Sequence, residues 1–130
     1  MLNTTRVTLE EFEEIAQQEF DALPRRFRES VDNVRIVIAA HATSSDRWRT
    51  GRGTTVPLLG LYEGVPVPLR GSSYGVYPVL PDTITLFKRT IEMVSRTPEE
   101  VRRTIRDTLI HEIAHHFGFS EDEIREAGYG

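Results

Sequence analysis

Residues 111–121 of the chain read His-Glu-Ile-Ala-His-His-Phe-Gly-Phe-Ser-Glu. In a helix, side chains four residues apart lie on one face, with their Cβ atoms about 5–6 Å apart. His111 and His115 have this spacing, so both imidazoles can coordinate one tetrahedral zinc ion. Glu112 follows the first histidine and would lie close enough to accept a proton from a water molecule at that ion. The stretch therefore predicts a helix, a zinc site and a hydrolytic reaction together.

The helix that carries these residues has clear start and stop signals. Thr97 is suited to cap its N-terminus, Pro98 to take the first helical position, and Glu100 to complete a capping box. Gly118 is suited to end it in the left-handed conformation, which predicts a helix over residues 98–117. The histidines lie on a polar side of this helix, and Glu112 lies at its border. The opposite side is apolar and consists of Ile105, Leu109, Ile110, Ile113 and Phe117.

A catalytic zinc site needs a third protein ligand besides two histidines. Gly118 permits a sharp reversal of the chain, which could return Glu121 to the metal. Asp122 is the nearest alternative, and Glu123 comes next. Residues 120–123 also form a capping box for a short terminal helix, so Glu121 can stabilise the start of that helix instead of, or as well as, binding metal.

Two other histidines have structural interpretations. His116 falls on the apolar side of the predicted helix, which indicates a packed or hydrogen-bonded side chain rather than a ligand. His41 follows the best predicted strand, and we interpret it as a strand-end residue, with a role near the substrate as the alternative.

The rest of the chain predicts one more long helix and a few strands. Thr8 and Glu11 form a capping box for a helix over about residues 8–22, which Pro24 ends. Arginines 25, 26 and 28 then follow in a segment that we expect to be solvated rather than a binding patch. The predicted strands are residues 34–40, 58–62 and 83–88, with an extended proline-containing segment at 65–69, loops at 43–55 and 71–81, and a short helix or turn at 90–95.

Length and composition place limits on the function. The chain has 130 residues, which predicts one domain over residues 1–130. It has no cysteine, so any metal must be bound by histidines and carboxylates. The net charge of −4 argues against nucleic acid as a partner. No apolar run is long enough for a membrane span, and the first residues lead into an acidic amphipathic segment rather than a signal peptide, so we expect a cytoplasmic protein that binds no membrane.

The motif resembles that of the zincin metallopeptidases, and the short chain with its motif near the C-terminus resembles the minimal zincins. The string His-Glu-x-x-His-x-x-Gly-x-x-Glu over residues 111–121 is similar to the metzincin pattern, with Glu121 where histidine or aspartate is usual. It lacks the Met-turn of metzincins, because Met1 and Met93 both precede the motif. Tyr129 could support the metal in its place, or simply pack against the core.

The resemblance implies an α+β fold, in which a small mixed β-sheet packs on an N-terminal helix and on the C-terminal motif helix. It implies one zinc ion per chain, held by His111, His115 and Glu121, with Glu112 as general base in peptide hydrolysis. A peptide or protein substrate would add to an edge strand around residues 58–69. The resemblance also predicts that Glu112→Ala keeps the metal and abolishes hydrolysis.

Three alternatives to an active peptidase stay open. The first is a catalytically degenerate zincin that binds a peptide or protein and cleaves nothing. The second is a metal-dependent nuclease, although related RNA-processing proteins use a third histidine where this chain has Glu121. The third is a purely structural helix that binds no metal. The sequence also leaves a homodimer open, although no exposed apolar stripe points to an interface.

Overall fold

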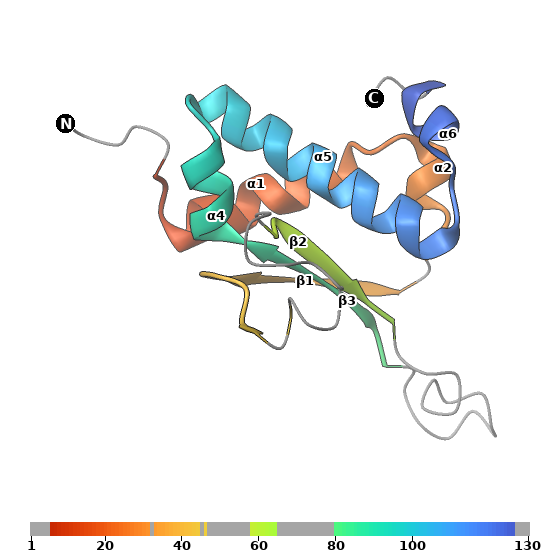
Figure 1. The fold of residues 1–130 in the computed structure, drawn as a ribbon, viewed down its shortest axis with the longest axis horizontal. Coiled ribbons are helices and arrows are strands. Elements are labelled where there is room, and N and C mark those ends of the chain that lie inside the picture. Colours follow the sequence, from red (N-terminus) through yellow and green to blue (C-terminus); the bar gives the residue numbers. More distant parts are fainter. Residues whose placement is uncertain (1–5, 32, 45, 47–57, 65–79, 127–130) are drawn as a thin grey trace.

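The computed structural model describes residues 6–31, 33–44, 46, 58–64 and 80–126 of the chain. These residues form helices, most of them packed over a small sheet (Figure 1). In chain order the elements are α1 (Leu9–Asp21), α2 (Arg25–Arg28), β1 (Val34–Ala39), β2 (Gly60–Glu63), β3 (Asp82–Phe87), α4 (Lys88–Val94), α5 (Pro98–Phe117) and α6 (Glu121–Glu126).

The sheet is mixed and has the order β1-β3-β2. β1 runs parallel to β3, with Val34 opposite Asp82, whereas β2 runs antiparallel to β3, with Tyr62 opposite Ile84. Parallel neighbours need a long crossover connection. β2 belongs to the connection between β1 and β3, and it pairs with the side of β3 that faces away from β1. β2 is therefore an edge strand of the sheet that the structure describes. The predicted α+β fold with a small mixed sheet is confirmed.

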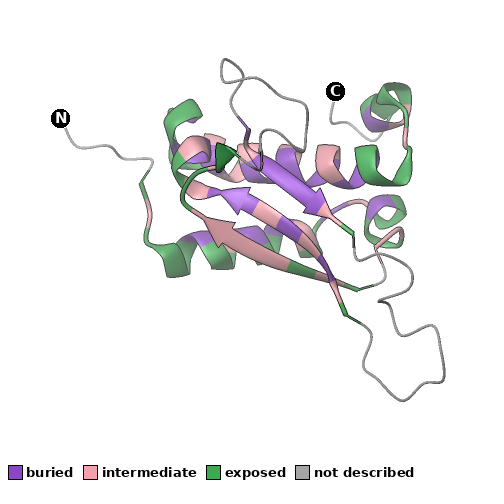
Figure 2. Ribbon diagram, turned by 60° about the horizontal axis from the view of Figure 1, so that its bottom comes forward, coloured by how far each residue is buried: buried purple, intermediate pink, exposed green. Residues whose placement is uncertain are grey.

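The two long helices lie on the same face of the sheet (Figure 1). α5 contacts α1, β2 and β3, and α1 also contacts β1. The apolar side of α5 supplies fully buried residues to the core between helices and sheet, and Figure 2 shows the buried residues along this interface. Arg102 on α5 and Glu19 on α1 add an ion pair of 2.8 Å across the helix pair. This packing fixes how the motif helix is placed against β2.

α5 begins and ends where the sequence predicts. The Thr97 hydroxyl accepts a hydrogen bond from the backbone N–H of Glu100 at 3.1 Å, and Pro98 occupies the first turn. Gly118 ends the helix in the left-handed conformation with φ of 76°. Phe117 departs from the expected apolar pattern, because its side chain is 41% exposed. It lies on the last turn, where its ring makes T-shaped contacts with Tyr62 and with the neighbouring His116.

β2 approaches α5 so closely that residue 60 must be small. A Cβ atom on Gly60 would lie 2.6 Å from Cγ2 of Thr108 and 3.1 Å from the backbone oxygen of Thr85. Both distances are shorter than ordinary van der Waals contacts. The glycine therefore lets the edge strand lie directly against the motif helix.

The remaining sequence predictions are mostly confirmed. α1 begins after Thr8, whose hydroxyl accepts a hydrogen bond from the N–H of Glu11, and the three strands and α4 lie within a few residues of their predicted ranges. The three arginines are exposed, as predicted, but their segment forms a short helix, α2, that the sequence did not predict, and Arg26 pairs with Glu123 of α6. Residues 65–69, and most of the predicted loops at 43–55 and 71–81, lie outside the described residues. Among the described helices, none is long and apolar enough to cross a membrane.

Candidate functional site

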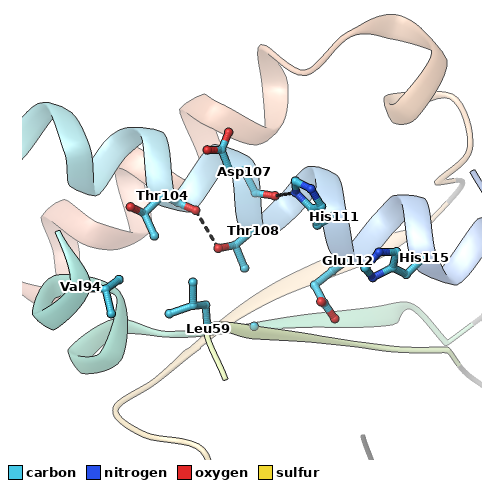
Figure 3. Close-up of a pocket in the computed structure, with 9 residues that line it drawn as sticks. Leu59, Val94, Thr104, Asp107, Thr108, His111, Glu112 and His115 are labelled. Atoms are coloured by element: carbon cyan, nitrogen blue, oxygen red, sulfur yellow. Dashed lines mark hydrogen bonds between the residues drawn. The ribbon is translucent and has the colours of Figure 1, made fainter. Parts of the chain in front are cut away.

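The predicted motif opens onto a groove between α5 and β2. Its cavity has a volume of about 420 Å³. Figure 3 shows the motif side chains on α5 above the strands, with Val94 of α4 and Leu59 at the other end of the groove. The lining residues are Leu59, Gly60, Val94, Thr104, Asp107, Thr108, His111, Glu112 and His115.

His111 is held by the helix one turn before it. Its Nδ1 lies 2.8 Å from the backbone oxygen of Asp107. A carbonyl oxygen only accepts hydrogen bonds, so Nδ1 carries the proton and donates it. In the neutral ring this leaves the lone pair on Nε2, which is the arrangement of a metal-ligating histidine whose orientation is fixed by a second hydrogen bond.

His115 and Glu121 lie next to each other, as the chain reversal at Gly118 predicts. The Nε2 atom of His115 is 3.4 Å from Oε1 of Glu121, and both side chains are more than half exposed. The ring of His115 lies 6.0 Å from that of His111, measured between centroids, at an angle of 72°. Of the three predicted ligands, the structure thus brings His115 and Glu121 into contact and places His111 one turn away.

The two alternative acidic residues have other partners. Asp122 forms an ion pair with Arg125 within α6. Glu123 accepts a hydrogen bond from the backbone N–H of Ser120 at 3.1 Å and pairs with Arg26 at 3.3 Å. The N–H of Ser120, more than the charge of Arg26, holds the pKa of the Glu123 carboxyl below its ordinary value. The contact of Glu121 with a motif histidine therefore keeps it the best candidate of the three acidic residues for the third ligand.

Glu112 is held by the edge strand. Its Oε1 atom accepts a hydrogen bond from the backbone N–H of Tyr62 at 3.1 Å, and the side chain is half-buried. The N–H of Phe87 on β3 donates to the oxygen of Leu59, so alternate residues of β2 face β3. The peptide groups of Gly60 and Tyr62 consequently face away from β3. On that side the Glu112 carboxylate accepts the hydrogen bond from the Tyr62 N–H. Figure 3 shows the Glu112 carboxylate directed toward the strands.

The donor atoms suit zinc, although they are not gathered around one point. Two imidazoles and a carboxylate are a common ligand set for catalytic zinc. Within residues that the structure describes, however, no three histidine, aspartate or glutamate side chains lie close enough together to hold a metal ion. The exposed side chains of His115 and Glu121 would have to rotate toward His111 to complete such a site.

The other sequence candidates lie outside this groove. The ring of His116 stacks on Tyr62 with 4.0 Å between centroids, so it is packed as predicted, but its other side is exposed. His41 is exposed after β1 and lines a separate cavity with Arg6, Arg89, Glu92 and Met93. Tyr129 lies outside the described residues.

The sequence predicts an edge strand around residues 58–69 at the substrate site, but not which of its residues meet the motif. Leu59 and Gly60 line the groove and Tyr62 contacts Glu112, although all three lie about fifty positions before the motif. Asp107 and Thr108 precede His111 by about one helical turn and share its polar side, which the helical spacing predicts.

The profile of a family described as zincin-like metallopeptidase matches residues 31–129, which include both strands that flank β3 and the whole of α5. No curated protein matches the chain.

Proposed function

The chain belongs to the zincin-like metallopeptidase family, and we propose that it is a zinc-dependent peptidase whose reaction takes place in the groove between α5 and β2. The observation that carries the proposal is the placement of the motif. His111, Glu112 and His115 line one cavity, and the edge of the sheet forms its other wall. An extended peptide could thus lie along the strand beside the residues that would cleave it.

We assign the zinc ligands to His111, His115 and Glu121, with one ion per chain. When bound, zinc would act as a Lewis acid that polarises the scissile carbonyl and makes water a better nucleophile at neutral pH. The hydrogen bond from His111 Nδ1 to the Asp107 oxygen orients this ring for ligation through Nε2. Glu121 is favoured over Asp122 by its contact with His115.

The Glu112 carboxylate would act as the general base. It would accept a proton from the attacking water and later deliver it to the leaving amine. Its hydrogen bond to the N–H of Tyr62 holds the side chain at the wall of the groove, which lowers the entropy cost of reaching a productive orientation.

The substrate would bind by adding a strand to β2. The peptide group of Gly60 faces away from β3, and no described strand pairs with that side of β2. Main-chain hydrogen bonds to this edge would hold any sequence in an extended form, and side-chain pockets would then supply specificity. The predicted absence of nucleic-acid and membrane partners, the cytoplasmic location and a homodimer stay predictions.

A catalytically degenerate zincin that binds peptides is the second candidate. It is favoured by the separation of His111 from the contact between His115 and Glu121, since no three ligands are gathered within the described part of the chain. Such a protein would bind peptides at the same edge and would hold zinc weakly or not at all.

Zinc stoichiometry separates the two candidates. We expect the wild-type protein to retain one zinc ion per chain after dialysis, measured by plasma mass spectrometry, and His115→Ala and Glu121→Gln to lose it. His116→Ala and Asp122→Asn are matched controls that should keep the metal, because neither residue is an assigned ligand. A wild-type protein that takes up no zinc from micromolar solution would contradict the proposed peptidase.

Glu112→Gln then tests the general base. Glutamine keeps an oxygen that can accept the Tyr62 N–H, whereas alanine would leave this partly buried donor without its partner and could disturb β2. We expect the variant to bind zinc like wild type and to lose at least about a hundredfold in hydrolysis of a quenched-peptide library. Hydrolysis at the wild-type rate would show that Glu112 is not the base.

A further inference from the structure

The groove continues beyond the motif toward α4 and is mainly apolar there. Leu59 and the half-exposed Val94 form one end of it. The hydroxyl groups of the two threonines that line it are already used. Thr108 donates to the backbone oxygen of Thr104 at 2.7 Å, and the Thr104 hydroxyl lies 3.0 Å from that of Ser95. This end of the groove therefore offers a substrate side chain apolar surface rather than free hydroxyl groups.

Asp107 supplies a negative charge at the rim of the groove. Among the described residues that line the cavity, it is the only charged side chain outside the three motif residues. Figure 3 shows its carboxylate on the same side of α5 as the His111 ring and directed away from the strands, so the charge lies at the solvent-exposed rim of the groove. The carboxylate is separate from the backbone oxygen that orients His111, so the side chain is not needed for that contact.

The neighbouring arginine does not neutralise this charge strongly. Nε of Arg106 lies 3.9 Å from Oδ1 of Asp107, at the limit of an ion pair, and the two side chains are 35% and 45% exposed. Exposed pairs of this length contribute little, because water screens them. A cation delivered by a bound peptide can therefore compete for Asp107.

On these grounds, and resting on the proposed function, we infer that the groove binds a lysine or arginine side chain adjacent to the scissile peptide bond. Such a side chain has an aliphatic stem and a cationic end. The stem would pack against Leu59 and Val94, and the ammonium or guanidinium group would reach the Asp107 carboxylate. Asp107 is thus a specificity-determining residue, and the substrate class is a basic peptide in extended form.

Peptides that differ only in charge test the inference. Quenched hexapeptides would carry Lys or Arg at each position in turn, beside the neutral analogues norleucine and citrulline. We expect zinc-loaded wild-type protein to cleave the basic peptides with kcat/KM about fivefold or more above their neutral analogues at one position next to the cleaved bond. Added salt should reduce the preference, because Asp107 is accessible to solvent.

Variants assign the preference to Asp107. Asp107→Asn should remove it and Asp107→Lys should reverse it, whereas Glu99→Gln should leave it unchanged. Glu99 is a matched control because it makes the same charge change on the exposed first turn of α5, outside the groove. A preference for the neutral analogues, or one that survives Asp107→Asn, would overturn the inference while leaving the peptidase proposal intact.

Binding measurements separate the two failures. The dissociation constants of fluorescein-labelled versions of the same peptides would be measured by anisotropy with Glu112→Gln, which needs no hydrolysis. Tighter binding of the basic peptides that Asp107→Asn abolishes would support the inference even in a protein that cleaves nothing, and in that case the peptidase proposal alone would fall. Equal binding of basic and neutral peptides, or no binding, would refute the inference.

Discussion

Replacing Gly60 by alanine tests whether the contact between β2 and α5 is as tight as the structure shows. The new Cβ atom would lie 2.6 Å from Cγ2 of Thr108. Carbon atoms attract at separations of about 3.5–4.0 Å, so the strand and the helix would have to separate by about 1 Å. That movement would also stretch the hydrogen bond between Tyr62 and Glu112, which is already 3.1 Å long.

The cost can be worked from the surroundings of Thr108. Its side chain is buried, and rotating the methyl group away would break the hydrogen bond from its hydroxyl to the Thr104 oxygen. Overpacking of such a site costs about 1–3 kcal/mol. Alanine also restricts the unfolded chain, which returns about 0.4–1 kcal/mol. We therefore expect Gly60→Ala to lower the free energy of unfolding by about 1–2 kcal/mol.

Urea unfolding followed by circular dichroism would measure this loss, and a second substitution would assign it. Thr108→Ser removes only the clashing methyl and keeps the hydroxyl, so the double variant should recover about 1 kcal/mol relative to the sum of the single changes. Gly118→Ala is the control, because its strain comes from a φ of 76° with no atom within 4 Å, and Thr108→Ser should not relieve it. Wild-type stability for Gly60→Ala, or additive effects in the double variant, would refute the close contact.

Two further predictions concern the ends of helices. Thr97→Ala removes the acceptor for the N–H of Glu100 and should destabilise the protein by about 1 kcal/mol in the same urea assay, whereas an unchanged midpoint would show that the cap contributes nothing. The pKa of Glu123 is lowered from 4.5, so its contribution to stability is present above that pH and is lost as the pH falls through the lower folded-state value. Glu123→Gln should therefore be less stable than wild type at neutral pH, and the gap should close on acidification; a gap that persists at pH 2 would contradict this assignment.

The sequence predicts the elements of this fold better than it predicts their contacts. Local signals define α5 fully, since Thr97, Pro98 and Gly118 mark its ends by properties of their own side chains. The prediction that Phe117 packs in the core with the apolar side of α5 is wrong, because its side chain is exposed. A helical pattern assigns a side to each residue, but it carries no information on how far the partner surface extends along the helix. The short helix α2 was missed because three arginines within four residues give no apolar period.

Long-range contacts account for the part of the site that the sequence left undetermined. The spacing of His111 and His115 predicts their shared face, and Gly118 predicts the return of Glu121, since each relation is set within one or two turns. The contact of Glu112 with Tyr62 spans fifty residues and depends on the register of β2 against β3. A shift of one residue would turn the other set of peptide groups toward α5, and no local pattern fixes that register.

The contact between Glu112 and Tyr62 also changes what the motif residues imply about activity. A protein that had lost its chemistry would still need an acceptor for the Tyr62 N–H, because an unsatisfied buried donor costs about 1–3 kcal/mol. Glu112 is therefore explained by the fold as well as by catalysis. The side chains of His115 and Glu121 are more than half exposed, and an exposed pair of this kind adds little to stability. The fold therefore gains little from this pair, so the zinc content of the His115 and Glu121 variants bears more directly on the proposed function than the loss of activity in any Glu112 variant.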